Sequence, residues 1–311
     1  MAGAAPRPVF GRPLLLLGAL LALAGLAWLG WRLGAPSVSP VVDARPALWR
    51  MEKDGRQAWL FGTIHAVPHG ERWLSPRIAD ALAHSDRLML EVTGLEAERR
   101  SRATFERLGH APNLPPIAER LDAPDAARFK ALVAATPSAF HGLDGYKSWA
   151  AALLINAASS SGLDLSAQEA GEAVLTERFA QEGKPIEGLE TISGQLGLFD
   201  ALPEADQRLL LAQAVSEAGD AERLYGDLHE AWARGDLARL ERQFLAPLSR
   251  SPSLRRALID NRNARWAGAI DAAVSRQPGT RFIAVGAGHL IGPASLQARL
   301  ATLGWRIERV Q

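Results

Sequence analysis

The chain has 311 residues, no cysteine and a formal net charge of +1 at pH 7. Its 48% hydrophobic and 22% charged residues exclude general disorder and a multi-span membrane protein, and the even mixture of charges argues against a nucleic-acid-binding surface. Without cysteine there is no disulfide, thiolate ligand or cysteine nucleophile, so any metal must be held by His, Asp or Glu.

An apolar stretch lies near the start of the chain. After Arg7 and Arg12, residues 13–31 carry no charge and consist mainly of Leu and Ala, roughly the ~20 residues that a helix needs to cross a bilayer. We predict a cytoplasmic tip and signal anchor over residues 1–34, which places the bulk of the chain on the periplasmic side of the inner membrane. The alternatives are a cleaved signal peptide, which would leave a secreted or periplasmic protein, and a buried core helix.

A Pro- and Ser-containing segment, residues 35–46, is predicted to be a linker, because such spacing resists helix continuation. Residues 47–311 are predicted to form a single domain. It begins with a β-hairpin whose strands cover residues 47–51 and 57–61, joined by a turn at Lys53-Asp54-Gly55-Arg56.

The next elements are a helix and a buried strand. Helical spacing of apolar residues covers residues 76–84, with Ser75 as the N-cap and Pro76 at the first helical position. Residues 87–92 are an apolar strand with Glu91 near its end. The first unit is therefore a strand, a loop, a helix and a strand that carries a carboxylate.

The middle of the chain, residues 95–273, is predicted to be mainly helical, interrupted by a short strand over residues 185–190. Its later helices are predicted over residues 204–218, 221–234 and 236–245. This helical part is treated as a large insertion into the domain.

The C-terminal part returns to strands. A β-branched apolar run over residues 281–285 ends at Gly286, and a helix follows over residues 296–303. The alternating residues 305–310 predict an edge strand. The expected fold class is therefore α/β, a central mixed sheet with flanking helices and the large helical insertion.

Two Gly-x-x-His segments, residues 62–65 and 286–289, each follow a predicted strand. Open α/β sheets present their ligand sites at the carboxyl ends of strands, so these ends would gather His65, Glu91 and His289 in one crevice. The glycines before each histidine would let the backbone turn sharply and approach a ligand closely.

Two imidazoles and a carboxylate suit Zn²⁺, Mn²⁺, Fe²⁺ or Co²⁺, with positions left for water and substrate. A water on such a metal has a lowered pKa and acts as a nucleophile near neutral pH. A histidine at a strand end is also compatible with a purely structural role, and the residues alone leave both interpretations open.

Several segments together resemble the TraB/GumN family, over about residues 48–310 and in consistent order. They are Phe61-Gly62-Thr63-Ile64-His65, Leu90-Glu91-Val92, Gly188-Leu189-Glu190-Thr191 followed by Gln195 and Phe199, Asp260-Asn261-Arg262-Asn263, and Val285-Gly286-Ala287-Gly288-His289-Leu290. Through that family the chain is also similar to TIKI-type Wnt-inactivating metalloproteases and, more remotely, to erythromycin esterase-like and ChaN-like proteins. The resemblance implies an α/β fold and catalytic or metal-binding roles for His65, Glu91 and His289.

The resemblance also draws attention to Arg262 and Asn263. Arg262 is expected either to pair with Glu91 or to stabilise an oxyanion, and a surface or helix-packing arginine is the alternative. Asn263 and Glu190 are expected to contact the metal ligands without binding the metal themselves. Glu190 is expected to orient a histidine, and the alternative is that it caps the following helix near Thr191. The family's Gly-hydrophobic-Asp element is replaced by Ala170-Gly171-Glu172-Ala173, which leaves an acidic residue there without a predicted role.

The sequence therefore predicts a metal-dependent hydrolase that acts on peptide or amide bonds of a peptide or small-molecule substrate. The metal (Mn, Co, Zn or Fe) would be held by His65, Glu91 and His289 and the oxyanion steadied by Arg262, and Glu91 would act as general base if it does not bind the metal. One alternative is a non-catalytic protein that binds haem or another metal-containing ligand through the same histidines, and another is a degenerate, membrane-bound regulator. The oligomeric state is not predicted.

The remaining histidines carry weaker signals. His69 lies in a Pro-Gly loop and is predicted to be exposed. The others, His84, His110, His141 and His229, are predicted to be surface or core residues.

Overall fold

The computed structural model describes residues 38–41, 43–93, 98–248 and 251–311. The predicted anchor and the first residues of the linker lie outside these ranges, so both stay predictions. Within the described ranges, no helix combines the length and apolar character that crossing a bilayer requires.

The predicted hairpin is confirmed. Strand β1 (Leu48–Lys53) pairs antiparallel with β2 (Arg56–Thr63) along its whole length. The turn residues Asp54 and Gly55 have φ of 49° and 71°, the left-handed conformations that a tight hairpin turn requires.

The central sheet is mixed and has six strands in the order β6-β4-β7-β2-β1-β8. The strands not yet named are β4 (Arg87–Val92), β6 (Ile186–Glu190), β7 (Arg281–Gly286) and β8 (Arg306–Arg309). The neighbours β6, β4, β7 and β2 run parallel, whereas β1 is antiparallel to β2 and β8. The carboxyl ends of the four parallel strands therefore lie along one edge of the sheet, and β8 is the predicted edge strand.

A second sheet pairs the two-residue strands β3 (Val67–Pro68) and β5 (Leu165–Ser166). The sequence analysis did not predict it, because two residues are too few to show an alternating pattern.

Helices account for most of the remaining described chain, as predicted. They are α2 (Pro76–Ala83), α3 (Glu98–Gly109), α4 (Ala123–Ala135), α5 (Ser148–Ser160), α6 (Gly171–Gln181), α7 (Ile192–Asp200), α8 (Glu204–Glu217), α9 (Ala221–Ala233), α10 (Leu237–Leu248), α11 (Pro252–Arg255), α12 (Asn261–Arg276) and α13 (Leu296–Thr302). The predicted start of α2 is confirmed, since Pro76 is its first residue and the Ser75 hydroxyl accepts a hydrogen bond from the Ile78 backbone N–H (3.3 Å).

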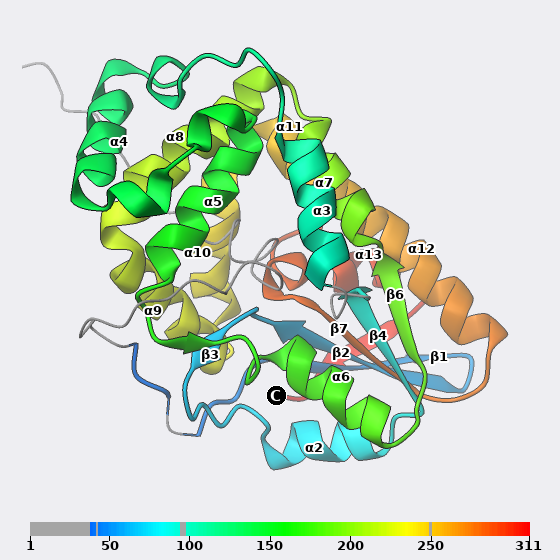
Figure 1. Cartoon of the computed structure of the whole chain (residues 1–311). Helices are drawn as coiled ribbons and strands as arrows, with labels where there is room; N and C mark the ends of the chain where they lie inside the picture. The colour runs from blue at the N-terminus through cyan, green and yellow to red at the C-terminus, as the bar shows by residue number, and fades with distance from the viewer. Residues whose placement is uncertain (1–37, 42, 94–97, 249–250) are drawn as a thin grey trace, which may run out of the picture.

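Helices cover both faces of the sheet (Figure 1). Along β7, Phe282 and Ala284 pack in the core on the side of α2 and α6, whereas Ile283 and Val285 pack on the side of α12 and α13. This alternation is expected for a strand that is buried on both faces.

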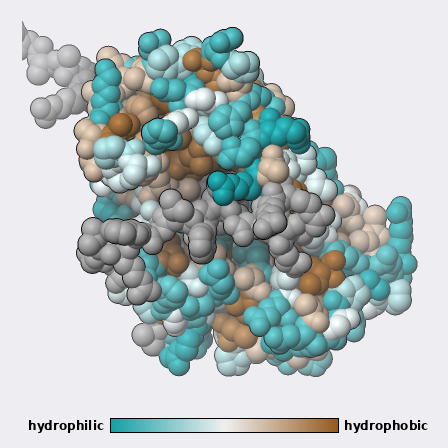
Figure 2. Space-filling view, viewed as in Figure 1, coloured by the Kyte–Doolittle hydropathy of each residue, from teal (hydrophilic) through white to brown (hydrophobic). Residues whose placement is uncertain are grey.

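The large helical part lies beyond the carboxyl ends of the parallel strands (Figure 1). Most of it is inserted between β4 and β6 and between β6 and β7. Figure 2 shows hydrophilic residues interspersed with scattered hydrophobic ones on the visible face. The sheet edge that holds the candidate site therefore faces the helical part.

Candidate active site

The parallel strands bring the predicted residues to one edge of the sheet. His65 follows β2, and His289 lies in a short 3₁₀ turn (Ala287–Leu290) that follows β7. Glu91 and Glu190 lie at the ends of β4 and β6. Because Thr63 is opposite Gly286 in the β2–β7 register, the two histidine segments leave the sheet at the same level.

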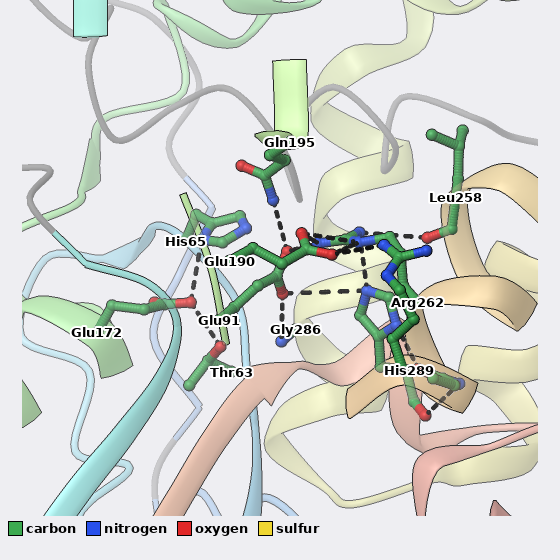
Figure 3. Close-up of polar contacts among 12 residues, drawn as sticks. Thr63, His65, Glu91, Glu172, Glu190, Gln195, Leu258, Arg262, Gly286 and His289 are labelled. Carbon is green, nitrogen blue, oxygen red and sulfur yellow. Dashed lines mark hydrogen bonds and ion pairs between the residues drawn. The ribbon is translucent and has the colours of Figure 1, made fainter. Parts of the chain in front are cut away.

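Glu91 lies at the centre of a buried polar network (Figure 3). Its Oε1 accepts hydrogen bonds from the Arg262 guanidinium and from Gln195 Nε2 (2.6 Å), and its Oε2 accepts one from the Gly286 backbone N–H (3.2 Å). Burial raises the pKa of Glu91, but the positive charge of Arg262 is the largest opposing influence, and the pKa is lowered to about 2. Glu91 is therefore a carboxylate at neutral pH.

Arg262 is a buried cation, with 1% of its side chain exposed. It pairs with Glu91 and with Glu190 (Nη2–Oε2 3.0 Å), donates from Nη1 to the Leu258 carbonyl (3.2 Å), and lies over the Trp266 ring, 4.5 Å from its centroid. Burial lowers the pKa of Arg262, but the two carboxylates outweigh burial and raise it. Arg262 thus adopts the predicted pairing with Glu91 and is not a surface arginine.

A π-helical turn (Arg256–Asp260) immediately precedes α12, the helix that carries Arg262. Such turns change the register of a helix and occur frequently at functional sites. The Leu258 carbonyl that binds Arg262 belongs to this turn. The turn therefore helps to fix the direction of the guanidinium.

His289 is neutral and its proton position is defined by its partners. Its Nε2 is 3.1 Å from Arg262 Nη1, and a guanidinium can only donate. Its Nδ1 is 2.7 Å from Asn263 Oδ1, while Asn263 Nδ2 donates to the carbonyls of His289 (3.2 Å) and Ala294 (2.9 Å). The proton is therefore on Nδ1 and the lone pair on Nε2, which lies 4.0 Å from Glu91 Oε2.

The protonation states of His289 and Glu91 predict a strong loss of stability in acid. Burial, followed by the charge of Arg262, lowers the pKa of His289 from 6.5 to about 3, so the unfolded chain binds this proton first as the pH falls below 6.5. The lowered pKa of Glu91 gives a contribution that is present above its unfolded value of 4.5 and is lost as the pH falls from 4.5 towards 2. We expect the free energy of unfolding, measured in urea, to fall between pH 6.5 and 2, and to fall less steeply in a His289→Gln variant. Equal slopes in the two proteins would contradict this assignment.

His65 lies on the other side of Glu91 (Figure 3). Its Nδ1 is 3.0 Å from Oε1 of Glu172, and the same oxygen accepts a hydrogen bond from Thr63 Oγ1 (2.5 Å). Glu172 lies in the first turn of α6, and no role was predicted for an acidic residue at this position. A glycine precedes it because a Cβ at Gly171 would lie 2.7 Å from Thr63 Cγ2.

The supporting residues do not all act as predicted. Asn263 orients His289, but the carboxylate of Glu190 binds Arg262 and Arg265 (Nη2–Oε1 3.1 Å) and so orients an arginine instead of a histidine. Nor does Glu190 cap α7, because the Thr191 hydroxyl does so by accepting from the Gly194 N–H (3.1 Å).

Gly62 and Gly288, in the two Gly-x-x-His segments, lie close to neighbouring side chains. Gly62, Gly286 and Gly288 do not have positive φ values, so none of them is required for a left-handed backbone conformation. A Cβ on Gly288 would lie 2.2 Å from the ring of Phe244, which is buried. Gly288 therefore allows α10 to pack directly against the His289 turn.

Four of the other histidines contact carboxylates away from this network: His69, His84, His110 and His229. His69 is exposed, as predicted, and its Nδ1 is 2.8 Å from Glu169 Oε1. His229 is buried, and its Nε2 is 2.8 Å from Glu71 Oε2. None of these contacts includes a residue of the network around Glu91.

The residues around Glu91 have the chemistry that a divalent cation needs. His289 is neutral with its lone pair on Nε2, Glu91 is ionised, and the buried Oε2 of Glu172 has no hydrogen-bond partner in the described part of the chain. Side chains of His, Asp and Glu in the described ranges do not form a preassembled group of three or more that could hold an ion. The chemistry of these side chains thus fits a metal ion. One of the candidate ligand atoms, Nε2 of His289, accepts a hydrogen bond from Arg262.

Comparison with known sequences and structures gives one match. The sequence model of the TraB/PrgY/gumN family matches residues 47–309. No curated protein and no solved structure matches the chain significantly. The matched range begins just before β1 and ends with β8, so it includes every strand of the central sheet.

Proposed function

The chain belongs to the TraB/PrgY/gumN family, and from this membership and the geometry around Glu91 we propose that it is a metal-dependent hydrolase acting on peptide or amide bonds. The observation that carries the proposal is the network of ionised Glu91, cationic Arg262 and neutral His289 at the carboxyl ends of parallel strands, with His65 beside it. Opposite charges and a neutral imidazole are thereby held together among buried side chains.

We assign His65, Glu91 and His289 as the residues that would hold a divalent ion, of Mn, Co, Zn or Fe. A bound ion of this kind polarises a carbonyl and lowers the pKa of a water molecule. Asn263 holds the proton of His289 on Nδ1, so the lone pair on Nε2 can bind a metal ion. Glu91 is ionised and can ligate, or can accept a proton from water as a general base.

Arg262 is the candidate for oxyanion stabilisation. Its guanidinium is held by Glu190 and by the Leu258 carbonyl, so its direction does not depend on a substrate. Fixed donors in a buried site stabilise the negative charge that develops on a carbonyl oxygen better than water does. Arg262 would then exchange its hydrogen bond to His289 for one to the substrate.

The charged surroundings of His289 favour this proposal over haem binding. Its Nε2 faces a guanidinium and a carboxylate, whereas a haem ligand normally faces the apolar surroundings of a macrocycle. We further propose that the domain acts on a peptide or small-molecule substrate outside the cytoplasm, tethered by the apolar residues 13–31.

Hydrolysis by the purified full-length chain tests the proposal. A peptide library is incubated with the protein and Mn²⁺, Co²⁺ or Zn²⁺, and cleavage is followed by mass spectrometry. We expect Glu91→Gln to lower the rate by on the order of 10²-fold or more, because it removes the carboxylate that would either ligate the metal or act as the general base. Glu169→Gln, which changes a surface glutamate away from Glu91, should leave the rate unchanged. Absence of cleavage with every ion, or full activity of Glu91→Gln, would refute the proposal.

A further inference from the structure

We infer that Glu172 is a positioning residue that holds the proton of His65 on Nδ1, so that Nε2 is the basic nitrogen of this histidine. The short contact between Nδ1 and Oε1 of Glu172, 3.0 Å, is the observation on which the inference stands. An ionised carboxylate only accepts hydrogen bonds, so the Nδ1 that faces it must carry a proton. Thr63 donates to the same oxygen and fixes its position from the end of β2.

The carboxylate of Glu172 is built into the fold. Gly171 lets the start of α6 approach Thr63, and α6 is anchored on the sheet through the buried Leu175 and Phe179. The second oxygen, Oε2, is buried and has no hydrogen-bond partner in the described ranges, so no surface cation accounts for this side chain.

The same arrangement occurs at the other histidine. Asn263, on α12, accepts the Nδ1 proton of His289, as Glu172, on α6, accepts that of His65. Two helices that pack on opposite faces of the sheet therefore impose the same tautomer on the two imidazoles. In both rings, Nε2 is then the nitrogen that carries the lone pair.

The functional consequence rests on the proposed function, because a metal ion binds the nitrogen that carries the lone pair. Acceptors that orient ligand histidines typically contribute about 10–100-fold to metal affinity. We therefore expect Glu172→Ala to weaken binding of Co²⁺ within that range. Glu172→Gln should weaken it less, because an amide oxygen still accepts the Nδ1 proton although its negative charge is lost.

Nuclear magnetic resonance of the ¹⁵N-labelled histidines of the full-length protein at neutral pH tests the tautomer directly. Long-range ¹H–¹⁵N correlations show which ring nitrogen carries the proton, and a His65→Gln variant assigns the signals. We expect Nδ1–H for His65 in the parent protein and in Glu172→Gln, and a population of the Nε2–H tautomer in Glu172→Ala. Glu169→Gln, which changes the acceptor facing His69, is the matched control and should leave the His65 signals unchanged.

A proton on Nε2 of His65 in the parent protein, a doubly protonated ring, or an unchanged tautomer in Glu172→Ala would overturn the inference. If Glu172→Ala does not fold, the parent spectrum and Glu172→Gln still decide the point. Cobalt titration by calorimetry is read separately from the spectra. An Nδ1–H tautomer that depends on Glu172, in a protein that neither binds Co²⁺ nor cleaves peptides, would leave the positioning role standing and remove the proposed function.

Discussion

Replacing Arg262 with methionine is expected to lower the free energy of unfolding by about 3–5 kcal/mol, because it leaves the buried Glu91 carboxylate without its cation. Glu190 would lose the same partner, although Arg265 would still reach it. Methionine has a similar length and remains compatible with the Trp266 ring, so the loss should come mainly from the removed charge. Equilibrium unfolding in urea at neutral pH measures the difference.

Arg265 provides the matched control for this experiment. It binds the same carboxylate, Glu190, but 54% of its side chain is exposed. Solvent-exposed ion pairs contribute about 0–1 kcal/mol, so Arg265→Gln should change stability by no more than that. Arg262→Lys should fall between the two variants, because lysine keeps the charge but cannot reach several acceptors with one planar group. An Arg262→Met protein as stable as Arg265→Gln would show that the buried pair does not stabilise the fold.

The fold could be predicted where the sequence pattern is local. The Asp54-Gly55 turn, the apolar run that becomes β7 and the Ser75-Pro76 helix start were each predicted correctly, because each depends on neighbouring residues. The end of α10 was predicted three residues early, at Leu245, where the helix continues to Leu248. Helix ends depend on packing as well as on local signals.

The candidate site could be predicted only in part. His65, Glu91 and His289 were found because strand ends are visible in the sequence, whereas Arg262 and Asn263 required the resemblance to a family. Gln195, Trp266 and Glu172 were not predicted to act at the site, although Gln195 was among the residues that carry the resemblance. Their places in the network depend on how α6, α7 and α12 pack on the sheet.

The partner of the Glu190 carboxylate could not be predicted from the sequence motif. As the last residue of a strand, Glu190 was expected to orient a histidine. Its carboxylate instead forms ion pairs with two arginines of α12. The spacing of Arg262 and Arg265 along one helix places both guanidinium groups on the same side, towards Glu190. Helical spacing indicates that the two arginines share a face, but it does not indicate which strand that face meets.

Metal binding by the two Gly-x-x-His histidines is the second large effect that we expect, and it tests the central claim most directly. The purified full-length chain, freed of metal with a chelator, should bind about one equivalent of Mn²⁺, Co²⁺ or Zn²⁺. His65→Ala and His289→Ala should each lower the affinity on the order of 10²-fold or more, because each removes a ligand. His69→Ala is the control, since this exposed histidine contacts Glu169 away from Glu91, and it should bind like the parent. Equal affinity of the parent, His65→Ala and His289→Ala, measured by calorimetry, would contradict a metal site at the carboxyl ends of these strands.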